Sequence, residues 1–247
     1  LIENICLVAI QISLKTVLMD GGIGIKTLTA LLVNFLILLF ISGLGAAAEI
    51  IVQPGSSIQK AVNNSNSGDV ITVKPGTYTE NINVTIDSLT IRSESGNPDN
   101  TIIKAKNSSA NVFFLQANNI KITGFKIVGA SKTGYAGICL SSSNNCIIEN
   151  NKLSINCYGI YVLRSKGDTL SKNTATSNKE YGIVLGTATD NILSGNIAYN
   201  NGRGIHVGNS DGNTLSGNTI QNNSAYGLSL CPICDTNLIY NNYLNNT

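Results

Sequence analysis

Four aspartates precede the same short apolar segment in four successive copies of a repeated sequence: Asp168, Asp190, Asp211 and Asp235. If the copies stack, the carboxylates form a ridge with neighbours about 5 Å apart. Carboxylates at that spacing repel one another unless protons or a cation intervene, and Ca²⁺ prefers oxygen ligands of this kind. Aspartate is also an ordinary turn residue, so the pattern predicts either a calcium site or structural turns.

A second candidate site combines two cysteines with the only histidine of the chain. Cys231 and Cys234 have the spacing of a CxxC motif, which closes a local disulfide or supplies half of a metal site. With His206 they are the candidate ligands for copper. The sequence holds no second cysteine pair at matching spacing. A local disulfide or free loop thiols, beside a histidine without a role, is therefore the alternative interpretation.

Aromatic residues form a third candidate site. Tyr158, Tyr181 and Tyr226 each stand directly before a glycine, and Arg203 takes this position in another copy. Tyr161 belongs to an outward-facing column with Cys139, Val184, His206 and Ser229. Stacked tyrosines offer flat apolar faces to a sugar, or they seal a corner of the core. The candidate sugar-binding residues are Tyr158, Tyr161, Tyr181 and Tyr226.

Catalysis would have to use Asp190 and Asp211 with Arg203, in a polysaccharide lyase or a glycoside hydrolase. A glycosidase requires two carboxylates that flank the scissile bond. Outward strand positions carry mainly Ser, Val, Tyr, Thr and Gly, whereas the carboxylates fall in turns. No acid pair can be named on a shared strand face, and we therefore expect a protein without catalytic activity.

The elements that position these residues follow from the repeat itself. A Gly-Ile or Gly-Leu pair recurs at Gly137, Gly159, Gly182, Gly204 and Gly227, in steps of 22 or 23 residues. A fixed period of this size indicates stacked identical units. Within one unit Ile183 and Leu185 alternate with Val184, which is typical of a strand with one buried face. Three short strands per coil predict an all-β, single-stranded parallel β-helix.

Asparagines mark the corners of the predicted coils. Each copy carries two at fixed places, because asparagine tolerates left-handed backbone and bonds its own neighbourhood. Stacked asparagines can also bond one another along the axis. The two series are Asn151, Asn173, Asn196, Asn218 and Asn242, and Asn156, Asn178, Asn201, Asn223 and Asn246. Phe125 takes the place of the first series in an earlier coil.

The N-terminal part of the sequence does not show the repeat. Residues 1–27 form an extension, of which 1–18 precede the only methionine, Met19, and suggest a misassigned start. Residues 28–48 contain an apolar run that ends in an Ala-x-Ala site, which predicts a signal peptide cleaved after Ala48, or an uncleaved anchor. Either alternative exports the β-helix domain, residues 49–247, to the cell surface or the medium. The chain ends in mid-pattern, so we expect a truncated domain.

Residues 58–62 form a short amphipathic segment after Ser57, which predicts a helix that covers the open end of the stack. This segment, the string from Gly68 to Tyr78 and Glu80-Asn81-Ile82 resemble the N-terminal region of right-handed parallel β-helix proteins of the pectin-lyase-like superfamily. The resemblance is to its NosD-type and prokaryotic cell-surface branch. It implies a right-handed β-helix over residues 49–247. Because the superfamily includes lyases, hydrolases, metal-processing proteins and adhesins, the resemblance leaves activity open.

Composition limits the choice of function. Charged residues make up only 12% of the chain and the net charge is +2, without a basic cluster that would bind nucleic acid. Five Asn-x-Ser/Thr sequons either permit N-glycosylation in an exported protein or arise by chance in an asparagine-rich sequence, at Asn63, Asn83, Asn107, Asn222 and Asn245. We expect an exported structural, carbohydrate-binding or partner-binding module. The alternatives are a polysaccharide lyase or glycosidase and a NosD-like copper-processing protein.

Overall fold

The computed structural model describes residues 47–246. The predicted N-terminal extension and almost all of the hydrophobic segment 28–48 lie outside the described residues, so export by that segment stays a prediction. Within residues 47–246 no helix combines the length and the apolar character needed to cross a bilayer.

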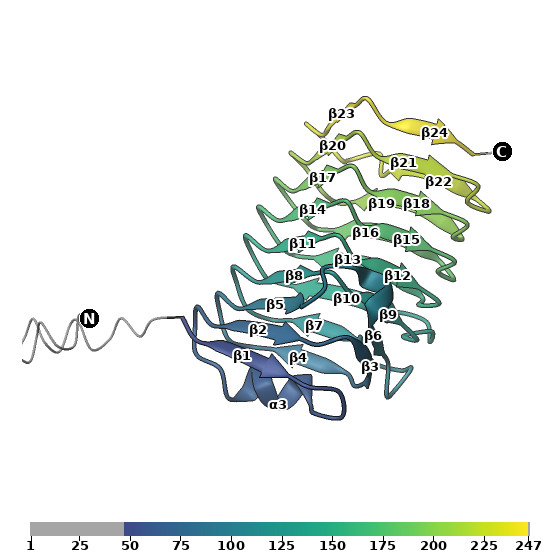
Figure 1. The fold of residues 1–247 in the computed structure, drawn as a ribbon. Coiled ribbons are helices and arrows are strands. Elements are labelled where there is room, and N and C mark those ends of the chain that lie inside the picture. Colours follow the sequence, from purple (N-terminus) through teal and green to yellow (C-terminus); the bar gives the residue numbers. More distant parts are fainter. Residues whose placement is uncertain (1–46, 247) are drawn as a thin grey trace, which may run out of the picture. The chain divides into compact units, whose positions relative to one another are not determined.

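Three parallel sheets run along the stack, and each coil from β2 to β22 contributes one short strand to each sheet (Figure 1). Sheet A consists of β1 (Glu49–Val52), β2 (Val70–Val73), β5 (Thr90–Ser93), β8 (Lys121–Thr123), β11 (Ile147–Glu149), β14 (Thr169–Ser171), β17 (Ile192–Ser194), β20 (Thr214–Ser216) and β23 (Leu238–Tyr240). Sheet B consists of β3 (Gly76–Thr79), β6 (Thr101–Lys104), β9 (Lys126–Val128), β12 (Lys152–Ser154), β15 (Thr174–Thr176), β18 (Ile197–Tyr199), β21 (Thr219–Gln221) and β24 (Tyr243–Asn245). Sheet C consists of β4 (Ile82–Val84), β7 (Phe113–Leu115), β10 (Ala136–Ser141), β13 (Tyr158–Leu163), β16 (Tyr181–Gly186), β19 (Arg203–Gly208) and β22 (Tyr226–Leu230).

The register of the strands places like residues on one another, as the repeat predicts. In sheet C the residues Ile138, Ile160, Ile183 and Ile205 form one column, and all four are fully buried. The predicted outward column is also confirmed, since Cys139, Tyr161, Val184, His206 and Ser229 are successive register partners. The period-two pattern therefore predicts the fold and these two columns of sheet C correctly, although Cys139 and Val184 of the outward column are buried.

Both asparagine series form ladders, which are buried except at the half-buried last rungs, Asn242 and Asn246. In each rung the side-chain oxygen accepts the backbone N–H and the amide N–H of the asparagine one coil earlier. Asn196 Oδ1, for example, accepts from Asn173 N at 3.0 Å and from Asn173 Nδ2 at 3.1 Å. The Asn196 amide nitrogen then donates to Asn218 Oδ1 at 3.0 Å and to the Leu170 carbonyl at 2.8 Å. All polar atoms of the buried amide are thus satisfied.

The left-handed corner residues are not the ladder residues. Positive φ falls on the residue directly before the rung, such as Lys172 (φ 55°) before Asn173 and Asn200 (φ 55°) before Asn201. The two demands that the sequence pattern assigns to asparagine are therefore divided between neighbours. One residue turns the chain, and the next points its amide into the corner.

The first coils are irregular and bulky, as expected. Phe125 stands below the ladder, where its backbone N–H donates to Asn151 Oδ1 at 3.1 Å, and its ring lies 5.9 Å from that of Phe113. The single turn η1 (Pro98–Asn100) is inserted before β6. Aromatic side chains fill here the volume that stacked aliphatic side chains fill in later coils.

The expected N-terminal helix is present as α3 (Ile58–Asn63), with Ser57 as its N-cap. Ile58 and Val62 are buried in the core. The Gln59 side-chain amide pairs with the backbone of Asn83 in β4, accepting from its N–H at 2.6 Å and donating to its carbonyl at 3.1 Å. A capping function of α3 stays a prediction, and this amide pairing on the end strand of sheet C supports it.

Replacing Asn196 by alanine is expected to lower the free energy of unfolding by roughly 2–4 kcal/mol, because buried partners on both neighbouring rungs lose their hydrogen bonds. Chemical denaturation followed by circular dichroism measures the loss. Asn83→Ala is the matched control, since the exposed Asn83 is held through its backbone, and a change within about 0.5 kcal/mol is expected. Equal losses in the two variants would contradict the ladder's role.

Candidate functional site

The candidate binding residues gather on the exposed side of sheet C. Tyr158, Tyr181, Arg203 and Tyr226 are successive register partners in β13, β16, β19 and β22. Tyr161 and His206 come from the neighbouring outward column of the same strands. The structure thus brings four of the predicted residues, Tyr158, Tyr161, Tyr181 and His206, onto one surface together with Arg203.

The rings are in mutual contact. Tyr158 lies edge-on to both Tyr161 and Tyr181, with centroid separations of 5.5 and 5.6 Å. The Tyr181 and His206 rings are tilted at 5.4 Å, and the Arg203 guanidinium carbon lies 5.0 Å from the Tyr181 centroid. These distances are those of favourable aromatic and cation–π contacts. We call Tyr158, Tyr161, Tyr181, Arg203 and His206 the sheet C aromatic cluster.

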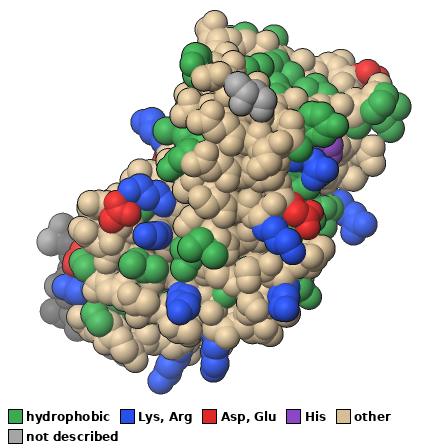
Figure 2. Space-filling view, turned by 90° about the vertical axis from the view of Figure 1, so that its right-hand side faces the viewer, with side chains coloured by type: hydrophobic (Ala, Val, Ile, Leu, Met, Phe, Trp, Pro, Cys, Tyr) green, Lys and Arg blue, Asp and Glu red, His purple; other side chains and the backbone are tan. Residues whose placement is uncertain are grey.

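Two glycines make room for this cluster. A Cβ atom on Gly186 would lie 3.0 Å from the Tyr161 ring, and one on Gly208 would lie 2.9 Å from His206 Nε2. The rings therefore lie close over the ends of β16 and β19, and a side chain at either glycine would displace the ring above it. Figure 2 shows the histidine, in purple, next to blue and green side chains on a surface otherwise dominated by uncharged groups.

The tyrosines are neither fully buried corner seals nor free side chains. Tyr158, Tyr161 and Tyr181 are half-buried, and Tyr226 is 60% exposed. The glycine after each tyrosine is buried together with the following isoleucine, which breaks the strict alternation and turns the ring outward. Strict alternation would give Tyr158, Tyr181 and Tyr226 the same phase as the buried isoleucines, and that expectation is wrong, whereas their alignment in one column is confirmed.

Burial and charge set the protonation of the cluster. Burial raises the pKa of Tyr158 to about 12, so its hydroxyl stays protonated. Burial and the neighbouring Arg203 lower the pKa of His206, which keeps the ring neutral at pH 7. Its Nδ1 lies 2.9 Å from Ser229 Oγ. The cluster thus presents hydroxyl and imidazole groups with one fixed positive charge, that of Arg203.

The expected ridge of four aspartates is not formed. Asp211 and Asp235 share one register position, where Asp235 N donates to Asp211 Oδ1 at 2.7 Å. Asp190 lies one residue further along its turn and forms an ion pair with Lys166 at 3.2 Å, while Asp168 is fully buried. Asp168 precedes the following strand by one residue, Asp190 by two, and Asp211 and Asp235 by three, and these offsets separate the carboxylates. The pattern was therefore wrong in placing all four in one column.

Asp168 occupies a rung of a third ladder that sequence reasoning missed. Its backbone N–H donates to Asn191 Oδ1 at 2.8 Å, and its own Oδ1 accepts from Cys146 N at 2.8 Å. Asn191 continues the ladder to Asn213, and Asn213 to Asn237, both at 3.0 Å. The sequence contains a pattern that indicates this ladder: Asp168, Asn191 and Asn213 each precede a buried leucine by two positions.

The second carboxylate oxygen of Asp168 has no hydrogen-bond partner among the described residues. In the asparagine rungs this position holds the amide nitrogen, which donates to the Oδ1 atom of the next rung. In Asp168 it holds an oxygen, which faces the Oδ1 atom of Asn191. A proton on the carboxyl group removes this conflict between two acceptors. Accordingly, burial raises the pKa of Asp168 to about 7.

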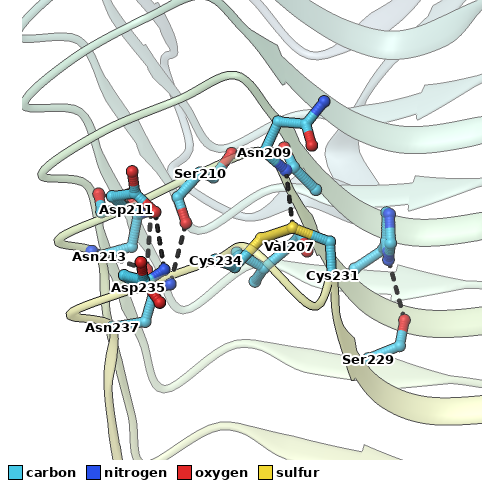
Figure 3. The surroundings of a disulfide bond; sticks show 12 residues. Val207, Asn209, Ser210, Asp211, Asn213, Ser229, Cys231, Cys234, Asp235 and Asn237 are labelled. Atoms are coloured by element: carbon cyan, nitrogen blue, oxygen red, sulfur yellow. Dashed lines mark hydrogen bonds between the residues drawn. A yellow bond between two sulfur atoms is a disulfide. The ribbon is translucent and has the colours of Figure 1, made fainter.

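The CxxC motif closes a local disulfide between Cys231 and Cys234, as the alternative interpretation predicts. Figure 3 shows the disulfide at the corner between sheets C and A, beside the turn of Asp211 and Asp235. Asn209 N donates to Cys231 Sγ at 3.1 Å. The coil from Asn213 to Asn237 has two residues more than the preceding one, and one of these two lies between Leu230 and Asn237, in the corner that the disulfide closes.

The candidate catalytic residues do not form a common site. Asp190 is paired with Lys166 and Asp211 accepts the Asp235 amide, whereas Arg203 stacks on Tyr181 in sheet C. The strands of residues 47–246 carry only two acids, Glu49 in β1 and Glu149 in β11. These strands are not neighbours in sheet A, so no acid pair faces one substrate bond on the described strands.

Residues 62–247 match the protein family described as "Periplasmic copper-binding protein (NosD)". The chain belongs to the NosD family. A cell surface glycoprotein of the archaeon Methanothermus fervidus is 36% identical over 129 residues, which make up 50% of this chain and 20% of the glycoprotein. This NosD-family chain thus spans about a fifth of the length of that relative. Both descriptions support an extracytoplasmic location.

Solved structures confirm the β-helix. Pectate lyase Pel9A has a TM-score of 0.58 at 16% identity, covering 74% of this chain and 56% of the lyase. The Dettilon tailspike protein has a TM-score of 0.61 at 15% identity, covering 78% of this chain and 44% of the tailspike. At this identity the likeness concerns the fold alone.

Copper does not fit the candidate ligands of this NosD-family chain as they stand. The Cys231 and Cys234 sulfurs are bound to each other, and a disulfide lacks the thiolate that binds metal. Burial raises the pKa of Cys139 and Cys146 to about 12, so these remain thiols. Within residues 47–246 no three His, Cys, Asp or Glu side chains gather as a metal-binding group. The same finding covers the four aspartates of the predicted calcium site, which do not gather into such a group either.

The buried Asp168 is expected to make stability fall as pH rises. Its folded pKa lies near 7, above the ordinary value of 3.8, so its contribution is fully present below pH 4 and lost above pH 7. The full loss amounts to roughly 4 kcal/mol. In Asp168→Asn the pH-dependent loss disappears, and thermal unfolding at pH 4 and pH 8 measures it. Asp190→Asn, at the exposed Lys166 pair, is the control that retains it. A loss that persists in Asp168→Asn would contradict the assignment.

Copper retention tests the disagreement with the family description. The oxidised chain, loaded with copper and desalted, is expected to keep much less than one equivalent, because its sulfurs are not thiolates. Reduction of the disulfide under argon before loading provides two thiols and is expected to increase retention. Stoichiometric copper in the oxidised chain, measured by mass spectrometry of the metal, would show that ligands outside this set exist.

Proposed function

We propose that the chain is an exported cell-surface or secreted β-helix module that binds carbohydrate through the sheet C aromatic cluster, without catalysis. The observation that carries this proposal is the contact of Tyr158, Tyr161, Tyr181 and His206 with one another and with Arg203 on one exposed face. The extracytoplasmic descriptions of the family and of the glycoprotein relative support the location.

The chemistry of the cluster favours an acidic glycan. Half-exposed rings offer apolar faces with polar edges, and such amphipathic groups are enriched where a protein binds a partner. The Arg203 guanidinium carries five donors in a plane that matches a carboxylate, and stacking on Tyr181 holds that plane in place. Uronate rings combine an apolar face with a carboxylate, which is the complement of this arrangement.

Catalysis has less support. A lyase or a glycosidase would need Asp190, Asp211 and Arg203 close together, and the contacts of these residues lie on different surfaces. A copper-processing function would need ligands beyond the disulfide and His206. A purely structural module is the alternative, and binding experiments distinguish it from a carbohydrate-binding module.

Binding to immobilised uronate-containing and neutral glycans tests the proposal. Tyr181→Ala is expected to weaken the wild-type affinity roughly tenfold, since one ring and the Arg203 stacking contribute about 1–2 kcal/mol. Tyr199→Ala is the matched control, because Tyr199 is half-buried on β18 in sheet B. Its affinity should be unchanged. Absence of binding to every glycan, or an equal effect of the two variants, would favour a structural module.

Turnover is measured on the same glycans. No release of unsaturated or reducing sugars is expected from the wild type, with buffer and Arg203→Ala as references. Product formation that Arg203→Ala abolishes would replace the binding proposal by a lyase assignment.

A further inference from the structure

The sequons differ in how the fold presents them. Eight residues, 105–112, separate β6 from β7, whereas three residues, 155–157, separate β12 from β13 at the same corner in a regular coil. Asn107 and Ser109 lie in this longer loop and both are exposed. A sequon that must enter the active site of a modifying enzyme has to lie in such an accessible loop.

The loop around Asn107 has a fixed shape. Ser109 N donates to Asn107 Oδ1 at 2.9 Å, which forms an Asx turn within the sequon. The Asn81 side chain accepts from Asn107 N at 2.7 Å and donates to the Asn107 carbonyl at 3.1 Å. These bonds occupy the backbone and the side-chain oxygen of Asn107. Its side-chain nitrogen forms no hydrogen bond with any residue of the described chain.

The other sequons are held in regular structure. Asn63 lies in α3 and its third residue, Ser65, is buried with its hydroxyl bound to the Val62 carbonyl at 2.7 Å. Asn222 directly precedes the buried ladder residue Asn223. Asn83 and Asn245 lie within strands β4 and β24. All four asparagines are themselves exposed, but for their sequons to enter the active site of an enzyme, part of a helix, a ladder or a sheet has to open.

We propose that Asn107 is an N-glycosylation site of this protein. The donor is an oligosaccharide linked through phosphate or pyrophosphate to a polyprenyl lipid, and an oligosaccharyltransferase of the cell catalyses the transfer. A bond forms between Asn107 Nδ2 and the sugar C1 atom, the C1–O bond to phosphate breaks, and the lipid phosphate leaves with the bonding electrons. One Nδ2 proton is released, and no oxidation or reduction takes place. The proposal requires export and is independent of sugar binding by sheet C.

Mass spectrometry of the full chain, secreted from a host that N-glycosylates exported proteins, tests the assignment. Trypsin cleaves after Lys106 and Lys121, and the peptide 107–121 contains one sequon. We expect this peptide to carry the mass of the host oligosaccharide. Asn107→Gln and Ser109→Ala should lose the added mass completely, whereas Ser109→Thr should keep it.

Asn222→Gln is the matched control, which should retain the glycan on the peptide 107–121. Melting curves of the variants monitor folding, and the wild-type peptide gives a result that depends on no substitution. An unmodified wild-type peptide, in a host that glycosylates a co-secreted sequon-bearing reporter, would overturn the proposal. Modification that persists in Ser109→Ala would overturn it as well, because the sequon would then be irrelevant.

Discussion

Buried side-chain amides stacked along the axis are the interaction on which the rest of the structure depends. An asparagine inside the corner has to satisfy an oxygen and a nitrogen away from water, and each unsatisfied group costs about 1–3 kcal/mol. Asn196 satisfies both, on the coil before and the coil after. This solution exists only where the neighbouring coil brings an identical residue to the same place. The ladders therefore fix the register of the sheets.

A fixed register has a consequence for the outer surface. Inward residues are restricted to shapes that stack, whereas outward residues are free to vary and still fall into columns. The contact of Tyr158 with Tyr181 needs no special turn, because sheet register alone aligns them. Arg203 then enters the same column over the ring below it. A binding surface arises in this way from ordinary strand positions, with glycines such as Gly186 providing the space for the rings.

Periodicity predicted the features that depend on stacking alone: the β-helix, the buried isoleucine column and the outward column through His206. It failed where a single offset decides the outcome. Asp168 and Asp190 look equivalent beside similar strands, yet a shift of one residue buries the first and leaves the second paired with Lys166 at the surface. Likewise, the exposure of Tyr226 depends on the buried glycine after it, and period-two alternation does not include that break. Ring contacts and the closing of the disulfide depend on three-dimensional proximity, which a repeat in one dimension does not encode.

Insertions occur in the corner loops that lie between the ladder rungs. Asn213 and Asn237 remain hydrogen-bonded rungs although their coil is two residues longer. One of the two extra residues lies in the corner between Leu230 and Asn237, where Pro232 and Ile233 are exposed and the Cys231–Cys234 disulfide closes the loop. The loop 105–112 is longer still, and there the Asn81 side chain takes the place of the disulfide by bonding the backbone of Asn107 and Asn111. Since the rungs on either side carry the stacking, a corner loop can change in length without loss of register. Differences in function between β-helices of this family are therefore expected at inserted corners and outward columns, while the amide ladders stay the same.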